Sequence, residues 1–399
     1  MAEDPKLVKF KIKHINWSLD YNDSGDRIST PIILQDKNGP CPLIALINTL
    51  LLTNDLQLNH HTDSIHIQID QTKSDAILHF KSVLLQHFHQ SVSIDLEVLL
   101  KHVGDLLLAF TDEQEDITPL LSSLPLLHTG LTVNPNLITG DFNQEDLATK
   151  LFTLFDLKFK HGWVINQIEN ENAEWSEELA ITSSNSNNSG GASTDDYSQL
   201  VEFFNRLETF DKIQDYLLLD AAHSTQETTI KHNQQLISKW LDLNRTQLTK
   251  IGLTKLNIGL NNQEFVIFFR NNHFSTLFKK SNNEFYILIT DTSFQSKNSC
   301  KIIWQSLNSI SGNDDLFFTG DFLPVLDIDQ DLRHPEEDVS VDYLLTKQLQ
   351  EQEDEELAKR MQKTYDKRSQ QPQPKKPPPA AKAATKDEKK KKKKTCTIV

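Results

Sequence analysis

The stretch PIILQDKNGPCPLIALINTLLL, residues 31–52, contains the sharpest change of character in the chain. It opens as a short apolar segment and passes into QDKNGP, residues 35–40, a polar loop rich in breakers of regular structure. After Pro42 the sequence is apolar all round and free of breakers. Proline is favoured at the first position of a helix, and a helix that is apolar on every side lies inside a core. We therefore predict a buried helix that begins at Cys41 or Pro42.

The segments around this helix predict an α+β protein with helices packed on a mainly antiparallel sheet. Alternation of apolar and polar residues over 7–17 indicates a strand, and helical spacing over 73–111 indicates one or two amphipathic helices. Residues 147–165 predict a helix, a turn at His161-Gly162 and then a strand. Further elements expected from the pattern are helices over 198–219 and 227–242 and strands over 264–270 and 285–290. No Gly-rich βαβ unit is present, which argues against a doubly wound parallel sheet.

Composition divides the 399 residues unevenly. Residues 1–364 carry 29 Lys and Arg against 53 Asp and Glu, whereas residues 365–399 carry 12 against 3. The acidic body argues against nucleic acid as a partner, and the basic tail favours a polyanion such as an anionic lipid surface. A Ser-, Asn- and Gly-rich stretch over 182–196 predicts a linker inserted in a main domain that covers residues 1–330.

The cysteines predict a free thiol in a reducing compartment. Cys41, Cys300 and Cys396 are too few and too scattered for a disulfide framework or a zinc site. The N-terminal residues lack the apolar region of a signal peptide, and no stretch approaches the 18 apolar residues of a membrane span. We expect a cytoplasmic, monomeric chain that needs no metal or cofactor.

Cys41 is the candidate nucleophile. A cysteine at the start of a helix faces unpaired N–H groups and the positive end of the helix dipole, which lower its pKa and favour the thiolate. The same N–H groups can donate to an oxyanion, and the side-chain amide of Gln35 can add another donor. A lone cysteine on an apolar helix is, however, more often a small buried hydrophobe.

His273 is the candidate general base. It follows the predicted strand EFVIFFR and opens the next one, in the setting RNNHFSTLF, whereas most of the other histidines lie on helical stretches or in polar turns. A histidine at the edge of a sheet can face a helix N-terminus across a cleft, as in papain-type thiol proteases. Thr290 and Asp291, at the end of the following strand, are both able to orient its ring.

Five stretches, in this order, resemble the MINDY deubiquitinases. They are PIILQDKNGPCPLIALINTLLL, LPLLHTGLTVNPNLITG, FKHGWVI, FVIFFRNNHFSTLFK and YILITDTSF, and the similarity runs from about residue 7 to 325. The resemblance implies a papain-like fold and hydrolysis of isopeptide bonds in polyubiquitin. It also implies a preference for the linkage that marks proteins for the proteasome, trimmed from the distal end. It assigns the nucleophile to Cys41, the base to His273 and the oxyanion donor to Gln35.

The same resemblance assigns an orienting threonine to Thr290. Because the preceding loop is one residue longer here, Asp291 stays a second candidate. Two alternatives to a deubiquitinase remain: a catalytically silent adaptor that binds ubiquitin chains, and a thiol acyltransferase on the same scaffold.

Two features follow the main domain. Residues 340–364 have the pattern of an acidic amphipathic helix, on which Leu344, Leu345 and Leu349 can line one face. Family members often carry a ubiquitin-interacting helix here, but Thr346 stands where that motif has a small alanine. The alternative is a solvated charged helix.

The last residues, KKKKKKTCTIV, suggest a lipid anchor. Cys396 lies four residues from the end, as in a prenylation motif, and the adjacent lysines would add affinity for an anionic membrane surface. Val399 leaves farnesyl and geranylgeranyl groups both open. A basic tail that merely solvates, or serves nuclear import, is the alternative.

Overall fold

The computed structural model describes residues 8–19, 27–36, 41–59, 70–111, 116–165, 194–220, 227–295, 301–312 and 315–325. The chain divides into two units, Met1–Leu326 and Asp327–Val399, and every described residue belongs to the first. The expected acidic helix, with Leu344, Leu345 and Leu349, and the tail with Cys396 therefore lie outside the described residues. So do residues 37–40 of the loop before Cys41, and 182–193 of the expected linker.

A small antiparallel sheet holds the N-terminal segment, as the alternation predicted. Its strand order is β2-β1-β3, and β1 pairs with both neighbours. The bounds are Lys9–Trp17 for β1, Ile28–Ile33 for β2 and Ser93–Asp95 for β3. Strand β3 was not predicted, because three residues between two helices are too few to show a period.

The second sheet has six strands in the order β4-β5-β6-β7-β8-β9, antiparallel except for the parallel pair β4 and β5. Together with the helices it makes the protein α+β, of the papain-like type predicted. The bounds are Phe159–His161 for β4, Glu264–Arg270 for β5, His273–Ser281 for β6, Glu284–Leu288 for β7, Trp304–Ser306 for β8 and Phe317–Phe318 for β9. The expected strand after Gly162 was wrong, since β4 precedes that glycine.

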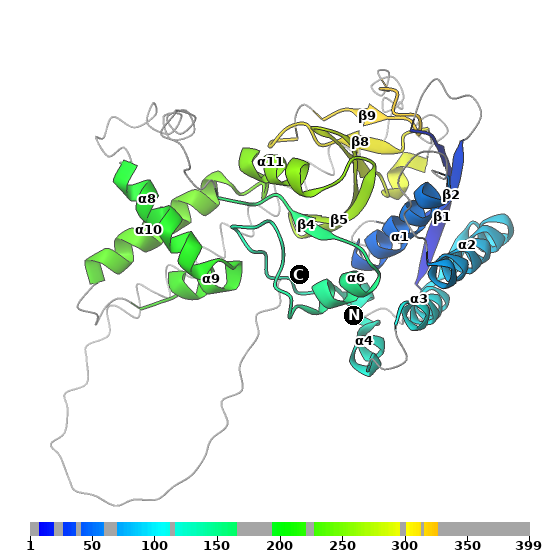
Figure 1. The fold of residues 1–399 in the computed structure, drawn as a ribbon, viewed down its shortest axis with the longest axis horizontal. Coiled ribbons are helices and arrows are strands. Elements are labelled where there is room, and N and C mark those ends of the chain that lie inside the picture. Colours follow the sequence, from blue (N-terminus) through cyan, green and yellow to red (C-terminus); the bar gives the residue numbers. More distant parts are fainter. Residues whose placement is uncertain are drawn as a thin grey trace, which may run out of the picture. The chain divides into compact units, whose positions relative to one another are not determined.

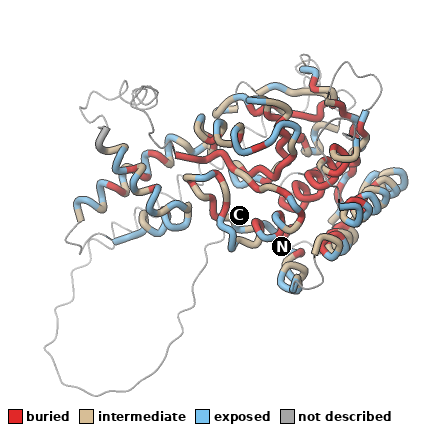
Figure 2. Tube along the Cα trace, viewed as in Figure 1, coloured by how far each residue is buried: buried red, intermediate tan, exposed pale blue. Residues whose placement is uncertain are grey.

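Helix α1, Cys41–Asn59, begins where the sequence predicted and lies between the two sheets (Figure 1), packing on β2 on one side and on β5 and β6 on the other. Among the described residues it is the helix that is long and apolar enough to cross a membrane, but most of it is buried inside the protein (Figure 2). Two polar side chains fix it. Asn48 bonds both backbone groups of Ile33 at 2.8 and 2.9 Å, and Thr49 bonds Thr276 on β6 at 2.9 Å.

The expected helical region 73–111 forms two helices. Helix α2, Gln71–Ser91, starts at Asp70, whose carboxylate accepts from the N–H groups of the first turn, and it ends at Val92, which has a φ of 57°. After β3, helix α3 spans Leu96–Phe110. Three short helices follow: α4 at Thr118–Ser123, α5 at Leu126–Thr129 and α6 at Leu147–Leu154.

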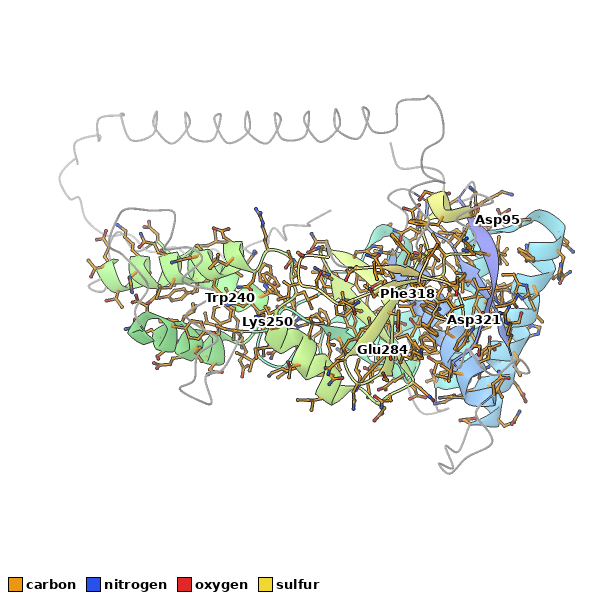
Figure 3. The ribbon with its side chains drawn as sticks, turned by 90° about the horizontal axis from the view of Figure 1, so that it is seen from above. Asp95, Trp240, Lys250, Glu284, Phe318 and Asp321 are labelled. Carbon is orange, nitrogen blue, oxygen red and sulfur yellow. The ribbon has the colours of Figure 1, made fainter. Side chains whose placement is uncertain are left out.

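Three helices pack on one another around a separate core that includes Phe204, Ile213 and Trp240 (Figures 1 and 3). They are α8 at Thr194–Leu207, α9 at Phe210–Leu217 and α10 at Glu227–Leu243. The region 198–219, expected to be helical, contains two helices, because Glu208 takes a φ of 63° and separates them. Helix α8 also takes in residues 194–196, which we had expected in the linker. Helix α11, Lys250–Gly259, then leads into β5.

Candidate active site

Cys41 is the first residue of α1 and is partly buried against the core. The backbone N–H of Phe274, the second residue of β6, donates a hydrogen bond to its sulfur. His273 is the residue directly before Phe274. The structure therefore brings Cys41 to the start of the strand that His273 opens.

The geometry of the β5–β6 hairpin explains why the N–H of Phe274 is available. The turn residues Asn271 and Asn272 both have positive φ, as a two-residue hairpin requires, and Arg270 pairs with His273 across it. The closing pair of such a hairpin exchanges hydrogen bonds, so the next N–H along the strand, that of Phe274, points away from β5. Among the described residues, the pairing of β6 with β7 starts at Leu277, so β7 does not pair with the N–H of Phe274.

Burial changes the ionisation that the sequence led us to expect. It raises the pKa of the Cys41 thiol, although the N–H groups of Phe274 and of Cys41 itself act in the opposite direction. The expectation of a lowered pKa for Cys41 was thus wrong, because desolvation outweighs the N–H groups that favour the thiolate. Desolvation lowers the pKa of His273, so its ring is neutral at pH 7. The resting pair is a thiol and a neutral base.

His273 stands on a hairpin that its neighbours hold firmly. The Arg270 side chain donates to the carbonyl of Thr246 at 2.9 Å, and the Gln247 side chain accepts from the N–H of Asn271 at 2.8 Å. His273 itself is exposed, and within the described ranges its ring makes no hydrogen bond. The backbone of the hairpin is therefore fixed while the His273 side chain stays accessible from solvent.

Gln35 and Thr290 lie side by side through their backbones. The N–H of Gln35 donates to the carbonyl of Thr290 at 2.7 Å, and the N–H of Thr292 donates to the carbonyl of Gln35 at 3.1 Å. Asp291, between them, is exposed and accepts from the N–H of Ser293 at 2.7 Å. The structure thus joins the proposed oxyanion donor to the segment with both candidate orienting residues. An orienting contact to His273 stays a prediction for each of them.

The sequence reasoning missed the polar contacts that place the site. Asn48 and Thr49 tie α1 to β2 and β6, and the only signal was two adjacent polar residues inside an otherwise apolar helix. Within the described part of the chain, no group of three or more His, Cys, Asp or Glu residues could hold a metal ion.

Known proteins resemble this chain over most of its length. The ubiquitin carboxyl-terminal hydrolase MIY1 of Saccharomyces cerevisiae is 35% identical over 344 residues, which cover 82% of each chain. The uncharacterized protein YGL082W of the same yeast is 26% identical over 85% of this chain and 81% of its own. The ubiquitin carboxyl-terminal hydrolase MINDY-1 of Mus musculus is 28% identical over 80% of this chain but only 55% of its own. The sequence model of the MINDY deubiquitinases matches residues 8–322, and the chain therefore belongs to the MINDY deubiquitinase family.

Proposed function

We propose that this chain is a thiol-dependent ubiquitinyl hydrolase that cleaves isopeptide bonds in polyubiquitin, with Cys41 as nucleophile and His273 as general base. The observation that carries the proposal is the hydrogen bond from the N–H of Phe274 to the Cys41 sulfur, because it joins the start of α1 to the residue after His273. Two of the relatives compared above are named ubiquitin carboxyl-terminal hydrolases, which supports the substrate class.

In the first half of the reaction, His273 takes the proton of the Cys41 thiol as the sulfur attacks the carbonyl carbon of the ubiquitin C-terminus. The carbonyl oxygen becomes an oxyanion in a tetrahedral intermediate. The protonated His273 then gives its proton to the departing lysine amine, the C–N bond breaks, and a thioester to Cys41 remains. A neutral His273 suits this role, since it must accept a proton before it donates one.

In the second half, His273 removes a proton from water, whose oxygen attacks the thioester carbonyl. Collapse of this second intermediate breaks the C–S bond, and the leaving sulfur regains its proton from His273. The products are a regenerated Cys41 thiol and the carboxylic acid of the ubiquitin C-terminus, which loses its proton to solvent and becomes a carboxylate. In both halves, we assign to the Gln35 side chain the hydrogen bond to the oxyanion. We assign the orientation of the His273 ring to Thr290, with Asp291 as second candidate.

We further propose that the enzyme prefers the ubiquitin linkage that targets proteins to the proteasome and trims such chains from their distal end. Family resemblance supports this part of the proposal. A panel of polyubiquitins of defined linkage tests it. The wild-type chain should shorten one linkage by single units, Cys41→Ala should cleave none, and Cys300→Ala serves as the matched cysteine control. Binding of chains without any cleavage by the wild type would favour the adaptor, and transfer of ubiquitin to added amine in preference to water would favour the acyltransferase.

The acidic segment 340–364 is proposed as a ubiquitin-binding helix, supported by the spacing of Leu344, Leu345 and Leu349. Replacing Leu345 and Leu349 together by Ala should weaken binding of long chains while leaving the turnover of diubiquitin unchanged. An unchanged affinity for long chains would contradict ubiquitin binding and favour the alternative of a solvated charged helix.

The tail is proposed to carry a prenyl group on Cys396 and to hold part of the cytoplasmic protein at a membrane surface through the adjoining lysines. Cys396→Ser should move the protein from membrane to soluble fractions. An unchanged distribution would contradict lipidation.

A further inference from the structure

Thr292 holds two consecutive residues of the loop that leads to the nucleophile. Its backbone N–H donates to the carbonyl of Gln35 at 3.1 Å, and its hydroxyl donates to the Asp36 carboxylate at 2.8 Å. Gln35 in turn donates its own N–H to the carbonyl of Thr290 at 2.7 Å. Three hydrogen bonds thus join residues 35–36 to residues 290–292, which are more than 250 positions away in the sequence.

The upstream end of the same loop is fixed independently. Asn48 bonds both backbone groups of Ile33, and the N–H of Leu34 donates to the carbonyl of Lys11 at 2.9 Å. The backbone of Gln35 and the carboxylate of Asp36 bond to the 290–292 segment. The position of residues 35–36 therefore depends in part on Thr292.

We propose that Thr292 is a positioning residue that acts through Gln35, with the Asp36 carboxylate as the acceptor of its hydroxyl. The inference rests on the proposed oxyanion role of Gln35. A side-chain donor stabilises an oxyanion only if its distance to the reacting carbon is fixed before the reaction, so a loosened backbone at residues 35–36 lowers the rate of the chemical step. Binding of ubiquitin, which contacts a much larger surface, is affected little.

Replacement of the hydroxyl tests the contact directly. Thr292→Val keeps the shape and the backbone N–H but removes the bond to Asp36, and we expect kcat on diubiquitin to fall about tenfold with KM changed less than about twofold. Thr292→Ser restores the hydroxyl and should recover most of the rate. The matched control is Thr254→Val on α11, where the lost hydroxyl bonds only Lys250 of its own helix; it should keep wild-type turnover. Thr292→Val with unchanged kcat, or with a change in KM alone, would overturn the inference.

The acceptor side gives a second, independent test. Asp36→Asn keeps an oxygen that can accept from Thr292, so it should retain most of the activity, whereas Asp36→Ala should resemble Thr292→Val. Should Thr292→Val fail to fold, this pair of variants tests the same bond. Equal activities of Asp36→Asn and Asp36→Ala would contradict the contact.

A double-mutant cycle with Gln35→Ala separates this inference from the function on which it rests. If Thr292 acts through Gln35, adding Thr292→Val to Gln35→Ala should cost much less than it costs the wild type. Additive losses would overturn the positioning role while leaving the role of Gln35 intact. Full activity of Gln35→Ala alone would instead remove the oxyanion role, so the two failures are distinguishable. Alkylation of Cys41 by iodoacetamide should be unchanged in Thr292→Val, which excludes general damage to the site.

Discussion

Phe274 donates its backbone N–H to the sulfur of Cys41 across 233 positions of sequence. The bond exists because the β5–β6 hairpin turns this N–H away from β5 at a point that the β6–β7 pairing does not reach. It sets the start of α1 against the strand that carries His273. The contact is made by the main chain of Phe274, so no side-chain substitution at that position removes it directly.

The first prediction concerns the reactivity of the resting thiol. Burial raises the pKa of Cys41, so alkylation of the free enzyme by iodoacetamide should be slower at pH 7 than that of a cysteine in a short peptide, and should keep rising above the ordinary thiol pKa of about 8.5. Cys41→Ala supplies the background from other cysteines. A rate that is already at its plateau at pH 6 would mean a preformed thiolate and would contradict the neutral pair.

The lowered pKa of His273 predicts the acid limb of catalysis. Since the base must be neutral, kcat/KM for ubiquitin chains should hold steady as the pH falls to the ordinary histidine value of about 6.5, and should decline only below it. The pH profile of diubiquitin cleavage measures this. A decline that starts above pH 7 would contradict the lowered pKa of His273.

The buried His161 predicts a loss of stability in acid. Its ring donates to the carbonyl of Asp141 at 3.0 Å and accepts from the N–H of Trp163 at 3.1 Å, and burial lowers its pKa to about 4. The unfolded chain takes up a proton near pH 6.5 and the folded one only near 4, so the free energy of unfolding should fall as the pH drops. The contribution from this residue is roughly 3 kcal/mol between pH 7 and 4.

Urea unfolding of wild type and His161→Gln at several pH values measures that contribution. The variant should be less stable at pH 7 but should lose less stability on acidification, and the exposed His232→Gln should follow the wild type. Equal pH slopes for wild type and His161→Gln would contradict the assignment.

Two glycines set how closely α11 approaches β4. A Cβ added at Gly252 would lie 1.8 Å from the carbonyl oxygen of Gly162, so Gly252→Ala must push the helix away. Overpacking of this kind costs about 1–3 kcal/mol or more. Gly259→Ala on the same helix is the control, because nothing lies within 4 Å of its added Cβ. Thermal unfolding should separate the two, and equal midpoints would contradict the close contact.

Truncation of Asn48 to alanine removes few atoms but should lower the stability of the protein strongly. Asn48→Ala leaves both the N–H and the carbonyl of the buried Ile33 without their partner, which should destabilise the protein by roughly 2–4 kcal/mol. The control is Asn59→Ala at the end of the same helix, which removes an exposed asparagine that bonds the Asp55 carbonyl. Thermal unfolding measures the difference. An unfolding midpoint of Asn48→Ala equal to that of the wild type, with Cys41 equally reactive, would contradict the role given to Asn48.

Much of the fold followed from local sequence. The helix at Cys41 and the strands β1, β5 and β6 were predicted because breakers and periodicity are local signals, and the α+β class followed from their order. Strand β3 and the break at Glu208 were missed, because short strands and single residues with positive φ depend on the packing around them. The place of β4 was wrong for a related reason. Its parallel partner β5 lies about a hundred residues downstream.

The site divides in the same way. Cys41, His273 and Gln35 were singled out from residue type, spacing and resemblance, and their catalytic roles stay predictions. The pKa of Cys41 was misjudged, because the helix N-terminus is visible in sequence whereas the depth of burial is not. The contacts of Asn48, Thr49 and Thr292 join distant segments, so no local pattern could have indicated them.

Mass spectrometry of the adduct formed with ubiquitin that carries an electrophile at its C-terminus tests whether Cys41 is the nucleophile. We expect one covalent ubiquitin attached to Cys41, absent from Cys41→Ala, strongly reduced in His273→Ala and retained in Cys300→Ala. No adduct, or an adduct on another residue that persists in Cys41→Ala, would contradict it.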